Sequence, residues 1–407
     1  MGSTVTLAEF PAGPGLLSSI SFQRFEIYAP GARIIVIDED GEHEIPRSER
    51  VHLRGYSADG NTRVGISFDP DASSPPYGSG SGPSGVFDLR GERVGNGWRL
   101  RALSEADALP AGVKPRFVAN EDSLPSTYAN SGPLDHLLGT DSSLLALRKA
   151  VVAVDTDTTF MSKRFSGSTT NATAWIADLF AQMNVMYQRD LSVTLLQGTT
   201  FLRTASDPYA NTDPVANSAM LDEFGNYWSA NYSGGSNTVA RSFAMLLSGN
   251  SNDPNGASGI AWINSYCKTA GFGGSYSTNQ IFTNPTVAVS YSASIVGHEL
   301  GHNFGAAHTH CTNTSTGAFP TGSNTIDKCS TSGTSCYSGA TSCPATGPGA
   351  PKGTIMSYCN QFNGGACGQN VQIFHPTHIT SLLVRIAANT PSCLSLANDT
   401  IFTNGFE

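Results

Sequence analysis

Residues 298–308 read HELGHNFGAAH, and this stretch decides how the whole chain is interpreted. On a helix, His298 and His302 lie one turn and about 40° apart, so both rings can reach one metal ion. Gly305 stands where this helix is expected to end, because glycine tolerates the left-handed conformation of a sharp turn. The turn is expected to bring His308 to the same metal as a third ligand.

Three histidine ligands leave a fourth position for water, which is typical of a catalytic zinc site and not of a closed structural one. Zinc lowers the pKa of its bound water and polarises the scissile carbonyl. Glu299 follows the first ligand and can face the open position without binding the metal. It is therefore the expected general base and later proton donor. The alternative is a catalytically silent zinc-binding adhesion or interaction module, against which the intact Glu299 argues.

Two details of the predicted helix follow from its neighbours. Ser292 or Ser294 is expected to cap the N-terminus of the helix, and Ile295 is expected to contact the core. His310 is the rival of His308 as third ligand, and the spacing from Gly305 favours His308.

The eight cysteines lie between Cys267 and Cys393, and none occurs earlier in the chain. An even number in one part of a chain is typical of a disulfide-stapled region formed in an oxidising compartment. A thiolate zinc cluster is the alternative, but no C-x₂-C pair occurs, so disulfides are favoured. We therefore expect a secreted, extracellular protein.

The formal net charge of −9 excludes one class of partner. An acidic surface repels phosphate backbones, so a nucleic-acid partner is not expected. No apolar run is long enough to span a bilayer. Leu16–Ile20 lacks the basic flank and long apolar core of a signal peptide, so we expect that an export signal was removed.

Residues 1–103 are predicted to form a mostly β module, because short alternating or apolar runs recur between turn residues. The runs are Ile20–Tyr28, Arg33–Ile37, Val51–Gly55, Arg63–Phe68, Gly85–Leu89 and Trp98–Leu103. Residues 104–142 are punctuated by prolines and read as a linker, where an activation cleavage is expected.

Residues 143–398 are predicted to form an α/β (α+β) catalytic domain, followed by a tail over residues 399–407. Lys149–Val154 and Leu191–Leu196 read as buried strands, and apolar residues between Trp175 and Tyr187 recur at helical spacing. Thr238–Leu247 is predicted as another helix. Strands that alternate with long helices indicate a layered α/β domain.

The motif at residues 298–308 resembles the HExxHxxGxxH signature of the metzincin clan of zinc endopeptidases, which a Met-turn follows. Gly353–Cys359 (GTIMSYC) looks like that turn, and the resemblance places Met356 beneath the metal without binding it. Met186–Val193 and Gly259–Cys267 are similar to stretches of the reprolysin (adamalysin-like) branch.

This resemblance spans roughly Leu144–Leu396 and implies a twisted mixed sheet with helices above a deep cleft, then a disulfide-rich C-terminal subdomain. It also implies a Cys267–Cys393 disulfide, one catalytic zinc, calcium as an optional further ion, and protein or peptide substrates. The chain resembles secreted bacterial members with an N-terminal propeptide, and the tail Ile401–Glu407 resembles the ends of some secreted bacterial proteins.

Many metzincin zymogens block zinc with a propeptide cysteine, and the cysteine-free N-terminal part excludes that device here. Occlusion of the cleft, or a carboxylate from Asp38–Asp40 or Glu121–Asp122, is the expected substitute. The N-terminal part is therefore expected to inhibit the zymogen, with an accessory module as the alternative.

Two residues depart from the reprolysin pattern. Reprolysins carry Asp directly after the third histidine, where this chain has Thr309. They also lack a tyrosine at the position of Tyr358, which astacins and serralysins have. By analogy with these, Tyr358 is expected to donate a hydrogen bond to the tetrahedral intermediate. The alternative is a core aromatic with a satisfied hydroxyl.

Overall fold

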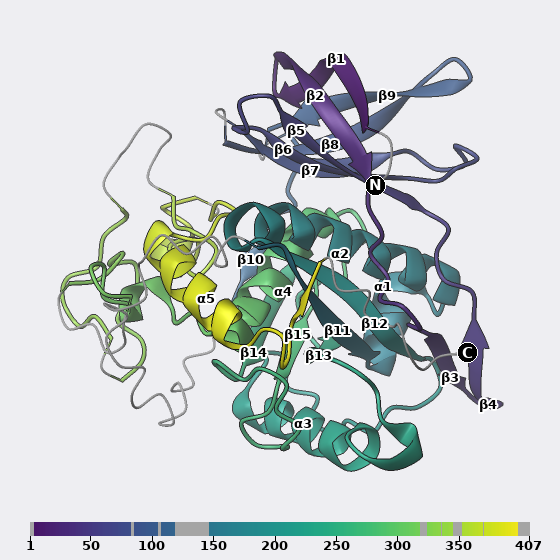
Figure 1. Cartoon of the computed structure of the whole chain (residues 1–407), viewed down its shortest axis with the longest axis vertical. Coiled ribbons are helices and arrows are strands. Elements are labelled where there is room, and N and C mark those ends of the chain that lie inside the picture. The colour runs from purple at the N-terminus through teal and green to yellow at the C-terminus, as the bar shows by residue number, and fades with distance from the viewer. Residues whose placement is uncertain are drawn as a thin grey trace.

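The computed structural model describes residues 4–82, 85–104, 107–118, 146–317, 324–334, 336–344, 352–368 and 370–397. The greater part of the predicted linker, the acidic pair Glu121–Asp122 and the tail Ile401–Glu407 lie outside these residues. The described chain forms two sheets with five α-helices (Figure 1). None of these helices is both long and apolar enough to cross a membrane.

The N-terminal part is mostly β, as expected, and its strands form a seven-stranded antiparallel sheet above the rest of the molecule (Figure 1). Buried Phe10, Ile20, Phe22, Val64 and Phe87 form the core of this sheet. In sheet order the strands are β1 (Thr4–Gly13), β2 (Leu16–Arg24), β5 (Val51–Ser57), β6 (Arg63–Phe68), β7 (Tyr77–Gly82), β8 (Gly85–Val94) and β9 (Gly97–Leu103).

The second sheet has nine strands and mixed direction, as expected for a metallopeptidase domain. Along its path the strands are β10 (Arg116–Phe117), β14 (Gly256–Ala261), β15 (Tyr276–Gln280), β13 (Phe243–Ser248), β11 (Arg148–Thr156), β12 (Val193–Arg203), β3 (Ile34–Asp38) and β4 (Gly41–Ile45). The short strand β16 (Ser395–Leu396) pairs with β11 off this path.

The hairpin β3–β4 comes from the N-terminal part of the chain but extends the second sheet, where it lies beside β12 (Figure 1). β3 runs parallel to β12, with Ile34 opposite Thr200. Ile34 and Val36 are buried in the main core, together with residues of the C-terminal half. The N-terminal part therefore adds two strands to the second sheet and side chains to the main core, an arrangement that local strand patterns do not reveal.

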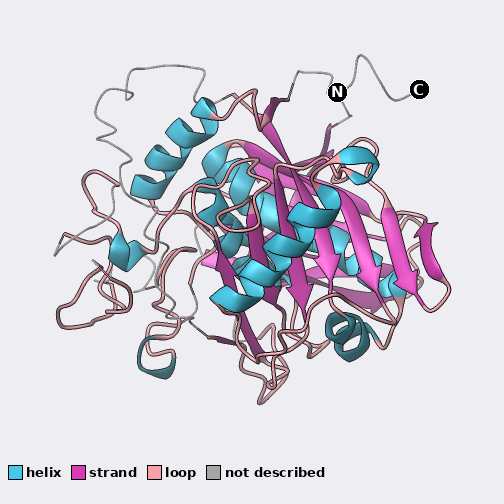
Figure 2. Ribbon diagram, turned by 90° about the horizontal axis from the view of Figure 1, so that it is seen from below, coloured by secondary structure: helices cyan, strands magenta, loops and turns pink. Residues whose placement is uncertain are grey.

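Helices cover both faces of the second sheet, and Figure 2 shows helices crossing its strands. Leu221, Phe224 and Trp228 of α3 pack on one face, and α1, α2, α4 and α5 supply the core on the other. The α-helices are α1 (Thr158–Phe165), α2 (Thr169–Leu191), α3 (Ser218–Tyr232), α4 (Val289–Phe304) and α5 (Pro376–Ala388). Three-residue 3₁₀ turns occur at Gly235–Asn237, Thr309–Cys311 and Phe362–Gly364.

The predicted helix over Thr238–Leu247 is wrong, because its second half is strand β13. Every residue of β13 is buried. Phe243, Met245 and Leu247 enter the core on one face, while Ala244 and Leu246 enter the core on the other. A strand covered on both faces reads as a continuous apolar run, which sequence periodicity does not distinguish from a buried helix.

All eight cysteines are paired in four disulfides, so the alternative of a thiolate cluster is wrong. The Cys267–Cys393 disulfide joins the segment after β14 to the segment after α5. The other three lie within the C-terminal region and are Cys311–Cys336, Cys329–Cys359 and Cys343–Cys367.

A polar interface joins the seven-stranded sheet to α2. Buried Asp178 of α2 lies 3.2 Å from Nε of Arg50 and 3.8 Å from Nδ1 of His52. His52 is itself buried and hydrogen-bonds Ser67 at 2.8 Å. Arg54 of β5 donates a hydrogen bond at 3.2 Å to Gln188, which lies further along α2. These contacts hold charged and neutral polar groups out of water between the two halves of the chain.

Candidate active site

Helix α4 carries the first two histidines of the motif, one turn apart, with their Nε2 atoms 3.1 Å from each other. The helix begins at Val289, so the predicted N-cap is wrong: Ser292 and Ser294 lie inside the helix, and Ala288 precedes it without a side-chain cap. The helix begins earlier than predicted, at Val289, because the side chain of Val289 is buried in the main core. Ile295 is buried in the same core, as expected.

Gly305 ends the helix with a φ of +109°, in the left-handed region that glycine favours. A Cβ at this position would lie 2.6 Å from Cδ of Arg385. The chain then reverses, and Nε2 of His308 lies 3.1 Å from Nε2 of His302. The ligand atoms of His298, His302 and His308 all lie within 4.8 Å of one another.

The chemistry of these three rings fits a cation. Nδ1 of His298 donates to the Ile355 carbonyl and Nδ1 of His302 to the Ala306 carbonyl, each at 2.7 Å. Since burial lowers the pKa of all three histidines, to about 4 for His298, the rings are neutral. The inward Nε2 atoms of His298 and His302 therefore both present lone pairs, which a shared metal ion satisfies.

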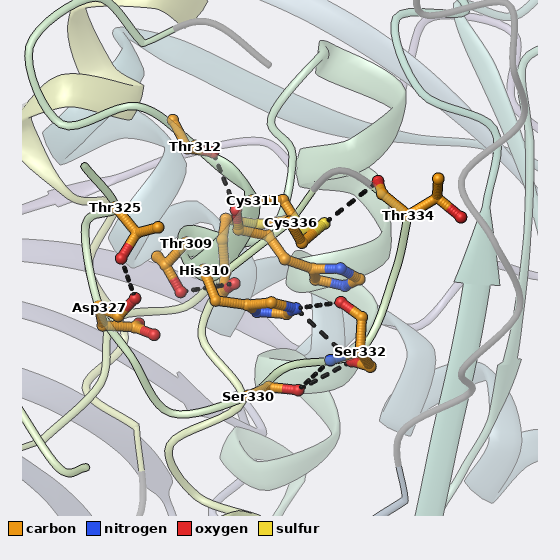
Figure 3. Close-up of a disulfide and its surroundings, with 12 residues drawn as sticks. Thr309, His310, Cys311, Thr312, Thr325, Asp327, Ser330, Ser332, Thr334 and Cys336 are labelled. Atoms are coloured by element: carbon orange, nitrogen blue, oxygen red, sulfur yellow. Dashed lines mark hydrogen bonds between the residues drawn. A yellow bond between two sulfur atoms is a disulfide. The ribbon is translucent and has the colours of Figure 1, made fainter. Parts of the chain in front are cut away.

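The ring of His310, the alternative to His308 as third ligand, is oriented differently from the rings of the three-histidine cluster. Its Nε2 donates to the Ser332 carbonyl at 2.9 Å (Figure 3). His308, His310 and Cys311 also lie close together, but the Cys311 sulfur is bonded to Cys336 and is not available as a thiolate. The geometry therefore favours His308 for the three-histidine cluster.

Glu299 is buried beside the cluster, against strand β14. Burial raises the pKa of its carboxyl well above the usual range. Its Oε2 atom has no hydrogen-bond partner among the described residues. A Cβ on Gly259 would lie 2.4 Å from Cγ of Glu299, so only glycine lets β14 and this side chain approach so closely. A buried carboxylate with an unused oxygen is suited to accept a proton.

The segment predicted as a Met-turn packs against α4 and against the segment that carries His308. Met356 is fully buried, and a Cβ on Gly301 of α4 would lie 2.7 Å from its sulfur. Its carbonyl accepts hydrogen bonds from the backbone N–H of Thr309 at 3.0 Å and from the Thr309 hydroxyl at 3.3 Å. Thr309, the departure from the reprolysin pattern, thus links the segment of His308 to the turn.

Tyr358 packs against the third histidine of the cluster. Its ring centroid lies 4.3 Å from that of His308 and 5.3 Å from that of His310. Tyr358 also lines a cleft of about 1400 Å³ together with His298 and Glu299. The ring therefore lies beside the histidines at the edge of a cavity, where a bound peptide could reach it.

Residues 109–118 form another wall of this cleft. The sequence predicts a linker there, but Arg116 and Phe117 form strand β10 on the edge of β14. Asp88 of β8 also lines the cleft and accepts a hydrogen bond from Ser290 of α4 at 2.7 Å. The N-terminal part of the chain thus contributes directly to the surroundings of the site.

Several residues that shape the site have no recognisable signal in the sequence. Gly259 lies in the stretch that resembles reprolysins, but nothing in that stretch indicates its contact with Glu299. The carbonyls of Ile355 and Ala306 orient the histidine rings through backbone atoms, which every residue type possesses. Only the three-dimensional arrangement identifies them.

Within the part of the chain that the structure describes, the groups of side chains close enough to bind a metal all contain histidine or cysteine. Calcium prefers a set of oxygen ligands. None of these groups is such a set, so the expected optional calcium has no support here.

A sheet with helices on both faces, three converging histidines and an adjacent buried carboxylate define the class of zinc-dependent metallopeptidases. The family model Reprolysin_5, described as metallo-peptidase family M12, matches residues 146–374. The match covers more than half of the chain, so the protein belongs to metallo-peptidase family M12, and the resemblance to reprolysins is confirmed. No curated protein sequence matches the chain.

Proposed function

We propose that the protein is a secreted endopeptidase in which His298, His302 and His308 hold one zinc ion and Glu299 acts as the general base. The observation that carries the proposal is the convergence of three neutral histidine rings beside a buried carboxylate with a free oxygen atom. Membership of a zinc-dependent peptidase family supports it.

When bound, zinc would polarise the scissile carbonyl and lower the pKa of water. Glu299 takes the proton from the attacking water as the C–O bond forms. It then gives this proton to the leaving amine as the C–N bond breaks. Gly259 keeps the carboxylate in place, and the carbonyls of Ile355 and Ala306 fix the orientation of the first two ligands.

Tyr358 is proposed to donate a hydrogen bond to the negatively charged oxygen of the tetrahedral intermediate. Its place on the cleft wall, against the ring of His308, supports this role. Met356 is proposed as a structural support under the histidines, because its side chain is fully buried against Gly301.

Secretion and storage as a zymogen are also part of the proposal. Four disulfides support an oxidising compartment. Residues 104–142 are proposed to contain the activation cleavage site, and the N-terminal part to restrain the enzyme until it is cut. Residues 107–118 of this segment support restraint because most of them line the cleft.

The test combines a metal assay with a peptide-cleavage assay. The wild type should contain one zinc per chain and cleave a peptide mixture in a chelator-sensitive way. Glu299→Gln should retain zinc and lose activity by roughly 10²- to 10⁴-fold, the usual contribution of a general base. Glu92→Gln, an exposed carboxylate on β8, is the matched control. Zinc binding without cleavage of any peptide by the wild type would favour the silent binding module.

A further inference from the structure

A cavity of about 180 Å³ lies between the seven-stranded sheet and helix α2. Strands β5 and β6 form one wall, and residues 181–189 of α2 supply side chains to the other. None of the described residues that line this cavity also lines the cleft at the histidine cluster. One water molecule needs roughly 15 Å³ of such space, so a small ion fits inside. The cavity is therefore a candidate binding site separate from the cleft.

The pairing of the strands turns two arginines toward this cavity. Arg54 of β5 lies opposite Gln23 of β2 and opposite Gly65 of β6. Arg63 comes two residues before Gly65 on β6, and residues at this spacing share one face of a sheet. Val64, which stands between them, is buried in the apolar core on the other face. Arg54 and Arg63 therefore share one face of the seven-stranded sheet.

This face is the one that covers α2, as the position of β5 and β6 above this helix indicates (Figure 1). A Cβ on Gly65 would lie 2.8 Å from Cγ2 of Val185 and 3.4 Å from the Ala181 carbonyl oxygen, both of α2. Only glycine therefore lets the helix approach the sheet so closely. The side chains of Arg54 and Arg63 line the cavity beside this contact.

The arginines that line the cavity differ in how their charges are balanced. Arg189 of α2 donates from Nε and Nη2 to the two carboxylate oxygens of Asp190, at 2.6 and 2.7 Å. Arg54 donates instead to the neutral amides of Gln188 and Gln23, at 3.2 and 3.4 Å. No Asp or Glu is among the described residues that line the cavity. The charge of Arg54 therefore has no counterion in these walls.

Arg63 has no counterion there either. Its Nε atom is buried without a hydrogen-bond partner in the described part of the chain, and its guanidinium group lies 5.5 Å from the ring centroid of Tyr56. Neither Arg63 nor Arg54 forms an ion pair with a described carboxylate. Burial, with a further contribution from the positive charge of Arg63, lowers the pKa of Arg54. Since arginine stays protonated in proteins, two positive charges face this cavity in a chain of formal net charge −9.

We propose that the cavity between β5, β6 and α2 is a binding site for a free phosphate or sulfate ion, held by the guanidinium groups of Arg54 and Arg63. The planar fork of arginine matches an oxyanion, and one fork occupies both oxygens of a carboxylate. The four oxygens of a tetrahedral ion accept from both forks at once. The bound ion balances both charges and links the seven-stranded sheet to α2. It requires neither the metal nor peptide cleavage.

The first experiment is calorimetric titration of the full-length chain with sodium phosphate, sulfate or acetate, at an ionic strength held constant with sodium chloride. Phosphate and sulfate should bind saturably to the wild type, and acetate should not bind there. Arg63→Gln should weaken phosphate binding at least about tenfold, the effect of one hydrogen bond to a charged group. Arg99→Gln removes an exposed arginine of β9 that does not line the cavity, and it should bind as the wild type does.

Three results of this titration would overturn the site. They are the absence of saturable binding, an equal loss of affinity in Arg63→Gln and Arg99→Gln, and binding of acetate as tight as that of phosphate. Arg63→Lys keeps the positive charge but not the fork, so it decides the question if Arg63→Gln does not fold. It should bind phosphate several-fold more weakly than the wild type, and an unchanged affinity would refute the role of the guanidinium group.

The second experiment locates the ion by hydrogen–deuterium exchange of the full-length chain with and without phosphate. Phosphate should slow the exchange of β5, β6 and residues 181–189 in the wild type and in Arg99→Gln, but not in Arg63→Gln. Phosphate also has access to a metal at the histidine cluster. Protection confined to residues 298–308 would therefore assign the ion to that cluster and overturn the proposed site.

Discussion

Gly259 of β14 and Glu299 of α4 lie so close together that a Cβ on the glycine would be 2.4 Å from Cγ of the glutamate and 2.5 Å from its Oε1. Gly259→Ala should therefore displace the carboxylate or the strand. We expect kcat to fall by about 10²-fold, the usual effect of misplacing a catalytic group by about 1 Å. Zinc content should not change, because the three atoms nearest to the added methyl group all belong to Glu299 and not to a histidine.

Steady-state kinetics and metal analysis of the same preparation separate these two effects. Gly234→Ala is the control, since a Cβ at that position meets no atom within 4 Å. Full activity in Gly259→Ala would show that the carboxylate tolerates displacement, and the role assigned to Gly259 would be wrong.

Gly305→Ala should weaken zinc binding. An alanine in the left-handed region costs about 1–2 kcal/mol of stability, and its Cβ would also collide with Arg385. Gly31→Ala is the matched control, because Gly31 has a φ of +70° with open space around it. Both variants should lose stability in thermal unfolding, but only Gly305→Ala should lose zinc on dialysis. Equal zinc retention would show that the turn does not set the position of His308.

Thr309→Val tests the link between the third histidine and the Met-turn. Valine keeps the shape of threonine but removes the hydroxyl that donates to the Met356 carbonyl. We expect a loss of about 1 kcal/mol in the free energy of unfolding, measured in urea, which is typical of one hydrogen bond. Thr309→Ser, which keeps the hydroxyl, should retain most of this energy. An equal loss in both variants would assign the effect to packing.

His52 should make the protein sensitive to acid. Burial, followed by the nearby charges of Arg50 and Arg24, lowers the pKa of His52 from 6.5 to about 3. A histidine with a lowered folded-state pKa loses its contribution to stability as the pH falls from its unfolded-state pKa toward 3. Between pH 7 and pH 4, the wild type should therefore lose roughly 3 kcal/mol more stability than His52→Asn.

The neighbouring Asp178 acts in the opposite direction, because burial raises its pKa to about 6 and acidification relieves its buried charge. Comparing wild type with His52→Asn at each pH cancels this contribution, which both proteins share. Parallel stability curves for the two proteins over this pH range would contradict the assignment to His52.

Local sequence was sufficient for much of the candidate site. The spacing of His298, His302 and His308, with Gly305 between the second and third, predicts a metal cluster whose geometry the structure contains. Local spacing predicts such a site because a helix and one turn create it. Gly259 and Thr309 were not predictable in this way, since their contacts join segments far apart in the sequence and depend on tertiary packing.

Single helices and strands were predictable where their apolar residues recur with a regular period. Strands β5 and β6 follow alternating runs, and α2 follows its helical spacing. Strand β13 was mistaken for a helix because it is buried on both faces and its apolar run has no period. The pairing of β3 with β12 was not predictable, because strand patterns do not indicate which partner a strand will find.

The pairing of β3 with β12 also affects how the protein is made. Ile34 leaves the ribosome long before its partner Thr200, so this parallel pair must wait for distant chain to be synthesised. A shortened gene that starts at residue 143 would produce β12 with an unpaired edge, and such edges promote aggregation. We expect that product to be insoluble unless an N-terminal fragment containing β3 and β4 is supplied during refolding.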